Sequence, residues 1–269
     1  MEFLTGLTPE ETLELEELLD ASRIGTEVRV RGAVHTIRDM GELSFVVLRK
    51  RDGLLQCIFE EGTTNYAVKD LREEMAVEIS GVLEEDARAP HGIEIRAREV
   101  KVFGRPYEAP PLPIGKWKLN TSLEAKLNYR STALRNVRER AKFRIQEGIV
   151  RGFRDFLYSQ HFTEIHTPKI GSKGAEGGSN VFKLDYFHRP AVLAQSPQFY
   201  KQMMVGVFER VFETAPVFRA EKHNTKRHLN EYTSLDFEMG YISGFEDIMA
   251  METGFLQYTM KLLLEEYAE

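Results

Sequence analysis

An arginine and a glutamate stand two residues apart at the end of an apolar run, in Phe218-Arg219-Ala220-Glu221. Alternate side chains of an extended strand share a face, so we expect Arg219 and Glu221 to lie side by side. The turn that follows is cationic and contains Lys222, His223, Lys226, Arg227 and His228. Because a guanidinium binds phosphate oxygens through two parallel hydrogen bonds, this hairpin suits a polyphosphate attached to a base. An ordinary salt-bridged hairpin is the alternative.

A glutamine and a lysine stand three residues apart in the segment Gln195-Ser196-Pro197-Gln198-Phe199-Tyr200-Lys201. Residues at this spacing lie on one face of a helix, so Gln198 and Lys201 are candidates for one binding site. A buried ammonium without a partner is costly, and a site that contains Lys201 therefore favours an acidic ligand. The alternative is that Lys201 is a solvated helix residue.

The composition is that of a globular protein, with 269 residues, 42% hydrophobic and 29% charged. The single cysteine, Cys57, excludes an internal disulfide. The N-terminus lacks a basic stretch followed by an apolar core, and no apolar run is long enough to span a bilayer. These features predict a cytoplasmic protein without a membrane partner. The net charge of -6 means that any nucleic-acid contact must use local basic patches.

Alternating apolar residues predict five strands in the first hundred residues, over 28–32, 43–48, 54–59, 77–82 and 93–103. Helices are predicted over 8–20 and 65–75. Three strands, a helix and two strands follow one another in the order of an OB-fold barrel, a common oligonucleotide binder. We assign residues 1–104 to this all-β barrel, and a generic small barrel is the alternative.

Four of the ten prolines fall within residues 104–115, which is typical of a semi-rigid linker, and we assign residues 105–134 to it. Beyond the linker we predict helices over 136–160, 197–208 and 245–268, strands over 162–168, 181–185 and 191–194, and a hairpin over 211–242. Strands that pair by hairpins, with helices around them, indicate an α+β domain with an antiparallel sheet over residues 135–269.

Together these segments resemble the class II aminoacyl-tRNA synthetases. Within that family, their sequences are most similar to the archaeal and eukaryotic aspartyl type. Residues 218–239 resemble motif 2 of that family, and Phe162 to Pro168, after a long helix, resembles motif 1. The resemblance implies ATP as a substrate, Mg²⁺ as its companion ion, and a homodimer with Pro168 at its interface. It also implies that Arg219 is the catalytic residue, which binds the α-phosphate and the amino-acid carboxylate.

The same resemblance implies an ATP-binding set within motif 2. Glu221 takes the position that meets the adenine amino group, and Tyr232 the position of an aromatic ring that stacks on adenine. The loop between them lies where the outer phosphates bind. The implied ATP-binding residues are Arg219, Glu221, Arg227, His228, Leu229 and Tyr232.

The segment Gln195 to Lys201 has the form Gln-Ser-Pro-Gln-x-x-Lys of aspartyl-tRNA synthetases. This form implies that Lys201 receives the side-chain carboxylate of L-aspartate and that Gln198 and Arg219 bind its backbone groups. The glycine-rich segment 174–180 resembles the loop that closes over the amino acid, in which Glu176 holds the α-amino group. A plain surface loop is the alternative. Asparaginyl relatives have Ser-Gly-Gln here and lack the lysine.

Residues 32–49 resemble the anticodon-binding domain of the same family. The resemblance implies that Phe45 stacks on the central anticodon base while Arg38 and Gln56 read base edges, as single-stranded RNA is commonly read. Phe45 as a core residue is the alternative. His35, with Pro90 in a later loop, resembles relatives that charge the asparagine tRNA as well as the aspartate tRNA.

The third motif of the family, a Gly-x-Gly-x-x-Arg pattern, does not occur after Tyr241. The acidic residues that hold magnesium in the family precede that motif, so we expect no metal site within these residues and a catalytic domain that is C-terminally incomplete. The expected function is aspartate–tRNA ligase, acting on tRNA(Asp) and, by the resemblance of His35 and Pro90, on tRNA(Asn). The alternatives are a non-catalytic tRNA- or amino-acid-binding paralogue and an asparaginyl-tRNA synthetase.

Overall fold

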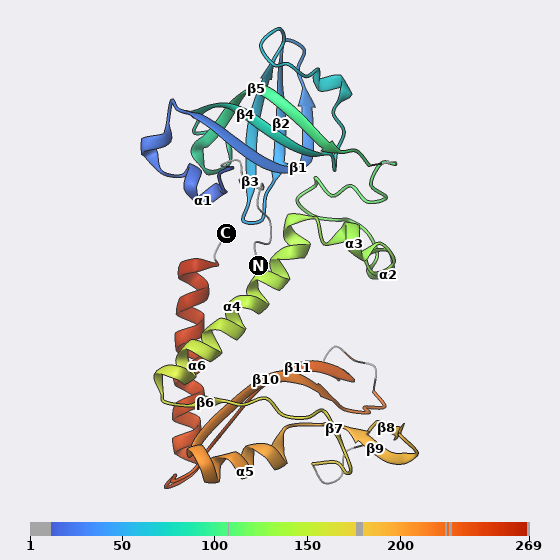
Figure 1. Cartoon of the computed structure of the whole chain (residues 1–269), viewed down its shortest axis with the longest axis vertical. Coiled ribbons are helices and arrows are strands. Elements are labelled where there is room, and N and C mark those ends of the chain that lie inside the picture. The colour runs from blue at the N-terminus through green and yellow to red at the C-terminus, as the bar shows by residue number, and fades with distance from the viewer. Residues whose placement is uncertain (1–11, 107, 176–179, 224, 226–227, 268–269) are drawn as a thin grey trace, which may run out of the picture. The chain divides into compact units, whose positions relative to one another are not determined.

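A computed structural model describes residues 12–106, 108–175, 180–223, 225 and 228–267 (Figure 1). The chain divides into two compact units, residues 1–141 and residues 142–269. The first unit contains the predicted barrel and linker, and the second contains the segments that resemble motifs 1 and 2. The predicted boundaries at residues 104 and 134 stay predictions.

The first unit is built on a closed five-stranded barrel with the strand order β1-β2-β3-β5-β4 (Figure 1). The strands are β1 (Glu27–Asp39), β2 (Leu43–Arg49), β3 (Leu54–Glu60), β4 (Ala76–Glu85) and β5 (Ile93–Gly104). The β3–β5 pair is parallel and the other pairs are antiparallel. The all-β OB-fold prediction is therefore confirmed.

The period of two along β2 sets the two faces of the barrel wall. Val46 and Leu48 are fully buried inside, and Phe45 and Val47 lie half-buried on the outer face. At the β4–β5 crossing, a Cβ on Gly81 would lie 2.1 Å from the backbone oxygen of Arg96. Only glycine allows the two strands to approach this closely.

The predicted helix over 65–75 is wrong. Only a 3₁₀ turn, η2 (Val68–Asp70), forms there. The side chain of Asn65 accepts a hydrogen bond from the backbone of Val100 (2.8 Å), and Met75 is buried at the other end of the segment. Anchors at both ends hold the segment against the barrel, so tertiary contacts override its helical propensity.

The predicted helix over 8–20 is shorter than expected. It consists of α1 (Leu15–Leu18), followed by the 3₁₀ turn η1 (Ala21–Arg23). Leu15 and Leu18 are buried, so packing on the barrel determines which turn becomes helical. The predicted helix start at residues 8 and 9 lies outside the described residues.

The linker packs within the first unit and contains two short helices, α2 (Leu123–Asn128) and α3 (Arg130–Ala133). Its own small core consists of Leu112, Ile114, Leu119 and Ala133. Asn136 then caps the long helix α4 (Val137–Ser159), because its side-chain oxygen accepts hydrogen bonds from the backbone of Arg138 and Glu139 at 3.2 Å.

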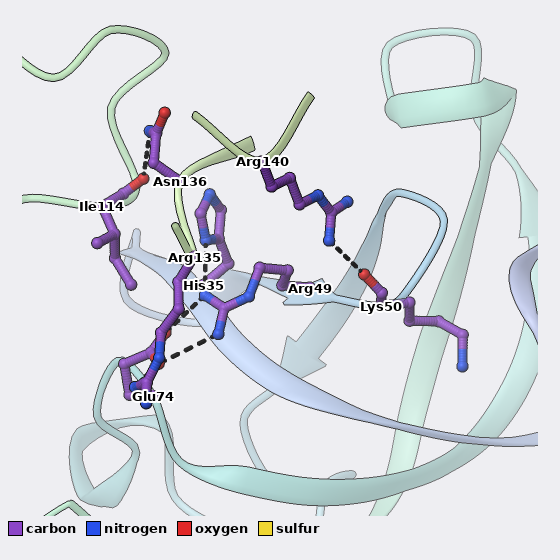
Figure 2. Close-up of polar contacts among 8 residues, drawn as sticks. All are labelled: His35, Arg49, Lys50, Glu74, Ile114, Arg135, Asn136 and Arg140. Atoms are coloured by element: carbon purple, nitrogen blue, oxygen red, sulfur yellow. Dashed lines mark hydrogen bonds and ion pairs between the residues drawn. The ribbon is translucent and has the colours of Figure 1, made fainter. Parts of the chain in front are cut away.

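A polar cluster joins the linker to the barrel, and Figure 2 shows it. The Glu74 carboxylate, 5% exposed, accepts hydrogen bonds from Arg49 on β2 (2.6 and 3.1 Å) and from Arg135 (2.5 Å). The backbone of Glu74 has a φ of 70°, a left-handed conformation that non-glycine residues adopt at a cost. Arg140 also donates to the backbone oxygen of Lys50 at 2.7 Å.

His35 lies in a bulge of β1 beside this cluster, with its Nδ1 3.4 Å from a guanidinium nitrogen of Arg49. The side chain is only 2% exposed. Burial first, and then the positive charge of Arg49, lower the pKa of His35 to about 4, while Glu74 opposes the shift. The imidazole is therefore neutral at pH 7.

This buried histidine predicts a loss of stability in mild acid. The unfolded chain protonates His35 near pH 6.5 and the folded chain near pH 4, so the free energy of unfolding should fall as the pH falls between these values. The full effect is about 3 kcal/mol. Urea unfolding at pH 7 and pH 4.5 measures it, and His35→Gln should flatten the dependence. The exposed His166→Gln is the control, and an equally steep slope in His35→Gln would contradict the assignment.

The second unit contains two three-stranded sheets. The first has the order β11-β10-β6 and comprises β6 (Thr163–Glu164), β10 (Arg210–Phe218) and β11 (Glu231–Met239). The second has the order β7-β9-β8 and comprises β7 (Ile170–Gly171), β8 (Lys183–Tyr186) and β9 (Arg189–Leu193). All strand pairs except β10–β6 are antiparallel, which confirms the predicted α+β architecture.

Helices α4, α5 (Gln198–Phe208) and α6 (Phe245–Glu266) accompany these sheets (Figure 1). The rings of Phe153 and Phe212 meet edge to face at 5.6 Å, which joins α4 to β10. A Cβ on Gly152 would lie 2.6 Å from the Thr259 hydroxyl, so the glycine permits close approach of α4 and α6. No described helix has the length and hydropathy needed to cross a membrane.

The strand predicted over 162–168 is shorter than expected, because only Thr163 and Glu164 pair with β10. The chain then leaves the sheet. The Glu213 carboxylate, which is buried, accepts hydrogen bonds from the backbone and hydroxyl of Thr167 (2.7 and 2.8 Å). It also pairs with Lys169 at 2.8 Å, so one carboxylate fixes the chain on both sides of Pro168.

Candidate substrate and RNA sites

The hairpin of β10 and β11 carries the residues that resemble motif 2. Strand β10 ends at Phe218, whose backbone N–H donates to the oxygen of Ala194 (2.9 Å). The N–H of Arg219 still donates to the oxygen of Asn230 (2.9 Å), but Glu221 donates to the oxygen of Arg219 (2.8 Å). This hydrogen bond between residues two apart is a γ-type turn, so the prediction that Arg219 and Glu221 lie on one face of an extended strand is wrong.

The structure brings Arg219 and Tyr232 together. The guanidinium carbon of Arg219 lies 5.9 Å from the centre of the Tyr232 ring, within the range of a cation–π contact. Tyr232 lies opposite Val217 in the hairpin and is half-buried. A cation and an aromatic face at one end of a sheet form a surface that suits a phosphate and a base.

The connecting loop places His228 at its exposed side. The Nδ1 of His228 lies 2.7 Å from the Thr225 hydroxyl, and its ring lies 5.4 Å from that of His223. Leu229 is also exposed. Two predicted site residues, Glu176 and Arg227, lie outside the described residues.

Lys201 on α5 is a buried candidate site residue with two ion-pair partners. Its side chain is 7% exposed, and its ammonium lies 3.1 Å from Asp236 and 3.5 Å from Glu238, two residues that share one face of β11. The interpretation of Lys201 as a solvated helix residue is therefore wrong. An ammonium has three hydrogen-bond donors. The two carboxylates orient the ammonium of Lys201 and take two donor directions, and the third direction suits a further acceptor.

The segment before Lys201 is fixed by backbone contacts. Gln195 is fully buried, and its amide donates to the backbone oxygen of Asn180 (3.4 Å). That same oxygen also accepts from the N–H of Ala220 (3.1 Å). A Cβ on Gly174 would lie 2.8 Å from the Gln195 side-chain oxygen. Gln195 thus ties three segments of the site together, while Gln198 begins α5 one turn before Lys201.

Sequence reasoning missed the positions of Gln195 and Glu213 in this unit. Both are polar residues with almost no exposed surface, and each joins segments distant along the chain. The only signal for Glu213 was a carboxylate inside an otherwise apolar strand.

The barrel brings the three predicted anticodon residues to one face. Arg38 on β1 lies opposite Phe45 on β2, and Gln56 on β3 lies opposite Val47 in the next row. Directly opposed residues of antiparallel strands point to the same side, so Arg38, Phe45 and Gln56 share the outer face. We call this surface the outer row face. The Gln56 amide donates to Glu94 (2.8 Å), which fixes its orientation.

The alternative that Phe45 is a core residue is wrong, because its neighbour Val46 takes the inward position.

His35 and Pro90 are not part of the outer row face. His35 is buried beside Arg49, and Pro90 begins the 3₁₀ turn η3 (Pro90–Gly92) and is half-buried. In this structure the His35 side chain has no open surface for a base contact.

Two regions of the chain match known domain families. Residues 122–269 match the class II tRNA synthetases (D, K and N), and residues 28–103 match the OB-fold nucleic acid binding domain.

Similar curated proteins include aspartate–tRNA(Asp/Asn) ligases. Those of Thermus thermophilus and Deinococcus radiodurans are 46% and 47% identical over 87% and 89% of this chain, and 54% of each relative is covered. That of Aeropyrum pernix is 41% identical over 91% of this chain and 56% of its own length. The chain therefore spans about half the length of the curated relatives that it matches.

Solved structures of the same group have this fold. Asparaginyl-tRNA synthetase from Pyrococcus horikoshii, complexed with asparaginyl-adenylate, superposes with a TM-score of 0.86 at 28% identity, over 96% of this chain and 59% of the other. A putative aspartyl-tRNA synthetase from Leishmania major gives 0.81 at 29% identity, over 99% of this chain and 55% of the other. With a family match over more than half of its residues, joined to a nucleic-acid-binding barrel, the chain belongs to the class II tRNA synthetases of the D, K and N group.

Proposed function

We propose that the protein with this chain is an aspartate–tRNA ligase that charges tRNA(Asp) and also tRNA(Asn). The observation that carries the proposal is the buried ammonium of Lys201, aimed by Asp236 and Glu238. An ammonium has three donors, so one donor direction is left for a ligand, and a side-chain carboxylate accepts a charge-assisted hydrogen bond there more strongly than a neutral amide does. The relatives that are 46% and 47% identical carry the name aspartate–tRNA(Asp/Asn) ligase.

In the proposed first step, a carboxylate oxygen of aspartate attacks the α-phosphorus of ATP. A P–O bond forms to the aspartate, the bond to the β-phosphate oxygen breaks, and pyrophosphate leaves with its electron pair. Arg219 stabilises the charge that develops on the α-phosphate. Tyr232, Glu221, His228 and Leu229 are proposed to hold the nucleotide, and Gln198 the backbone groups of aspartate.

In the second step, a hydroxyl oxygen of the terminal ribose of tRNA attacks the aspartyl carbonyl carbon. The ester C–O bond forms, the C–O bond to the phosphate breaks, and AMP leaves with the electron pair while the hydroxyl proton is released. Catalysis in both steps comes from positioning and charge neutralisation, and no side chain forms a covalent bond. Mg²⁺ commonly accompanies ATP, but the described residues contain no cluster of three His, Cys, Asp or Glu side chains that could hold a metal.

The outer row face is proposed to read the anticodon, with Phe45 stacked on a base and Arg38 and Gln56 at base edges. Because His35 is buried, its proposed influence on tRNA choice, with that of Pro90, acts through the shape of the barrel.

We further propose a cytoplasmic homodimer in which Pro168, held by the Glu213 contacts, lies at the interface.

An RNA-binding experiment tests the barrel part of the proposal. The chain should bind a stem-loop RNA that carries the aspartate anticodon, and Phe45→Ala should weaken that binding about tenfold through loss of one stacked base. The same variant should bind a non-hydrolysable aspartyl-adenylate analogue as tightly as the unsubstituted chain. Equal loss of both ligands would indicate that Phe45 serves folding and not RNA binding.

The asparaginyl alternative has one observation in its favour, the TM-score of 0.86 to an asparaginyl-tRNA synthetase. Tighter binding of an asparaginyl-adenylate analogue than of the aspartyl analogue would support it over the proposal.

A further inference from the structure

The linker presents an exposed tryptophan between two lysines, Lys116-Trp117-Lys118, which we call the linker tip. Trp117 is the only tryptophan in the chain and is 71% exposed. The residues on either side, Ile114 and Leu119, are buried in the linker core. A large aromatic ring left in water between buried anchors loses the free energy of burial, which makes it a candidate for ligand contact.

The backbone that carries the linker tip is fixed. The fully buried side chain of Asn136 donates to the oxygens of Ile114 (2.9 Å) and Lys116 (2.6 Å). Figure 2 shows the first of these bonds, between the start of α4 and the loop. Because the same Asn136 caps α4, the loop is tied to the end of a helix. A fixed aromatic ring binds with little loss of conformational entropy.

The loop rests on the barrel beside the outer row face. A Cβ on Gly115 would lie 2.3 Å from the methyl group of Thr36 and 3.2 Å from the backbone oxygen of His35. Thr36 is opposite Val47, and the next pair along these strands is Ile37 and Val46, followed by Arg38 and Phe45. The linker tip therefore begins where the outer row face ends.

Glu74 provides a second attachment of the same linker. Its carboxylate binds Arg49, which follows Phe45 and Val47 along the outer side of β2, and Arg135, which precedes Asn136. The bridge spans the barrel and the start of α4, so it holds in place the helix end that fixes the loop.

We propose that the linker tip extends the RNA-binding surface of the barrel. Trp117 stacks on a base of single-stranded RNA next to the nucleotides at the outer row face, and Lys116 and Lys118 bind the adjoining phosphates. An aromatic ring flanked by cations is the common platform for single-stranded RNA, and each stacked base is worth about 1–3 kcal/mol. The inference rests on the proposed function, because that function supplies the RNA.

RNA fits the linker tip better than a lipid surface does. The net charge of -6 repels an anionic membrane and RNA alike, and the two local lysines could bind the phosphates of either, so charge does not separate the two partners. The tip, however, continues a face of an OB-fold, whose strands and loops commonly bind oligonucleotides.

Because Trp117 is the single tryptophan, its fluorescence reports the contact directly. We would titrate the chain with an end-labelled anticodon stem-loop, following RNA anisotropy and Trp117 emission together. The two signals should saturate at the same RNA concentration. Trp117→Ala should weaken binding about tenfold, and Trp117→Phe, which keeps a stacking ring, should stay within about threefold. Tyr241→Ala, which removes another exposed aromatic ring, is the matched control and should stay within about twofold.

The possible outcomes separate this inference from the proposed function. RNA binding with unchanged Trp117 emission and an unaffected Trp117→Ala variant would overturn the inference and leave the proposed function intact. Failure of the unsubstituted chain to bind the stem-loop would overturn both. An emission change caused by vesicles of anionic phospholipid, and not by the RNA, would overturn the inference in favour of membrane contact.

Discussion

A Lys201→Met variant should lose aspartate binding by a factor of about 100 or more and should be less stable by about 3 kcal/mol. The substitution removes the cation that pairs with both Asp236 and Glu238, and the two carboxylates lose the charge that this ammonium supplies. Their side chains are 17% and 31% exposed, so water reduces the penalty and we expect the lower end of the range for buried pairs. Urea unfolding and calorimetric titration with an aspartyl-adenylate analogue measure the two effects.

A matched control separates the two effects of this substitution. Lys261→Met also removes a lysine from an ion pair, with Glu265, but both partners are largely exposed. It should change stability by less than about 1 kcal/mol and leave analogue binding unaltered. A Lys201→Met/Asp236→Leu double variant should regain part of the stability but no aspartate binding. Retained aspartate binding in either Lys201 variant would contradict the role given to this ammonium.

A Glu74→Ala variant should be less stable by about 3 kcal/mol, because it leaves Arg49 largely buried without its carboxylate. Burial raises the pKa of Glu74, but the hydrogen bonds and charges of Arg49 and Arg135 outweigh it, and the net pKa is lowered. The stabilisation is therefore complete above the ordinary pKa of 4.5 and is lost as the pH falls through the folded value. The variant should lose less stability below pH 4.5 than the unsubstituted chain does.

Two signals measure the Glu74 effect. Trp117 emission follows the linker, and circular dichroism follows the secondary structure of the whole chain. Both urea midpoints should shift downward in Glu74→Ala. Glu60→Ala, which removes a half-exposed partner of Arg96, is the control and should cost less than about 1 kcal/mol. Unchanged midpoints in Glu74→Ala would show that the bridge does not stabilise the fold.

The helices and strands that carry a regular hydrophobic period could be predicted from the sequence. Alternation gave the five barrel strands and placed Arg38, Phe45 and Gln56 together, because opposed strands share a period of two. The helical period and the Pro197 start gave α5, with Gln198 and Lys201 one turn apart. The helix expected over 65–75 does not form, because the contact of Asn65 with Val100 on β5 outweighs the local helical propensity.

Contacts between distant residues could not be predicted in the same way. Lys201 and Asp236 are 35 positions apart, and Arg135 and Glu74 are 61 positions apart. No period links such residues, so their pairing follows only from the tertiary fold. The turn at Arg219 was missed for a related reason, because strand alternation carries no information about where pairing stops.

Binding of the two adenylate analogues to the 269-residue chain tests the central claim most directly. Calorimetric titration with non-hydrolysable aspartyl- and asparaginyl-adenylate analogues compares ligands that differ only in a side-chain carboxylate and amide. The aspartyl analogue should bind at least about tenfold more tightly, and Lys201→Met should abolish the preference. Equal affinities, or a preference for the asparaginyl analogue, would contradict an aspartate site at Lys201.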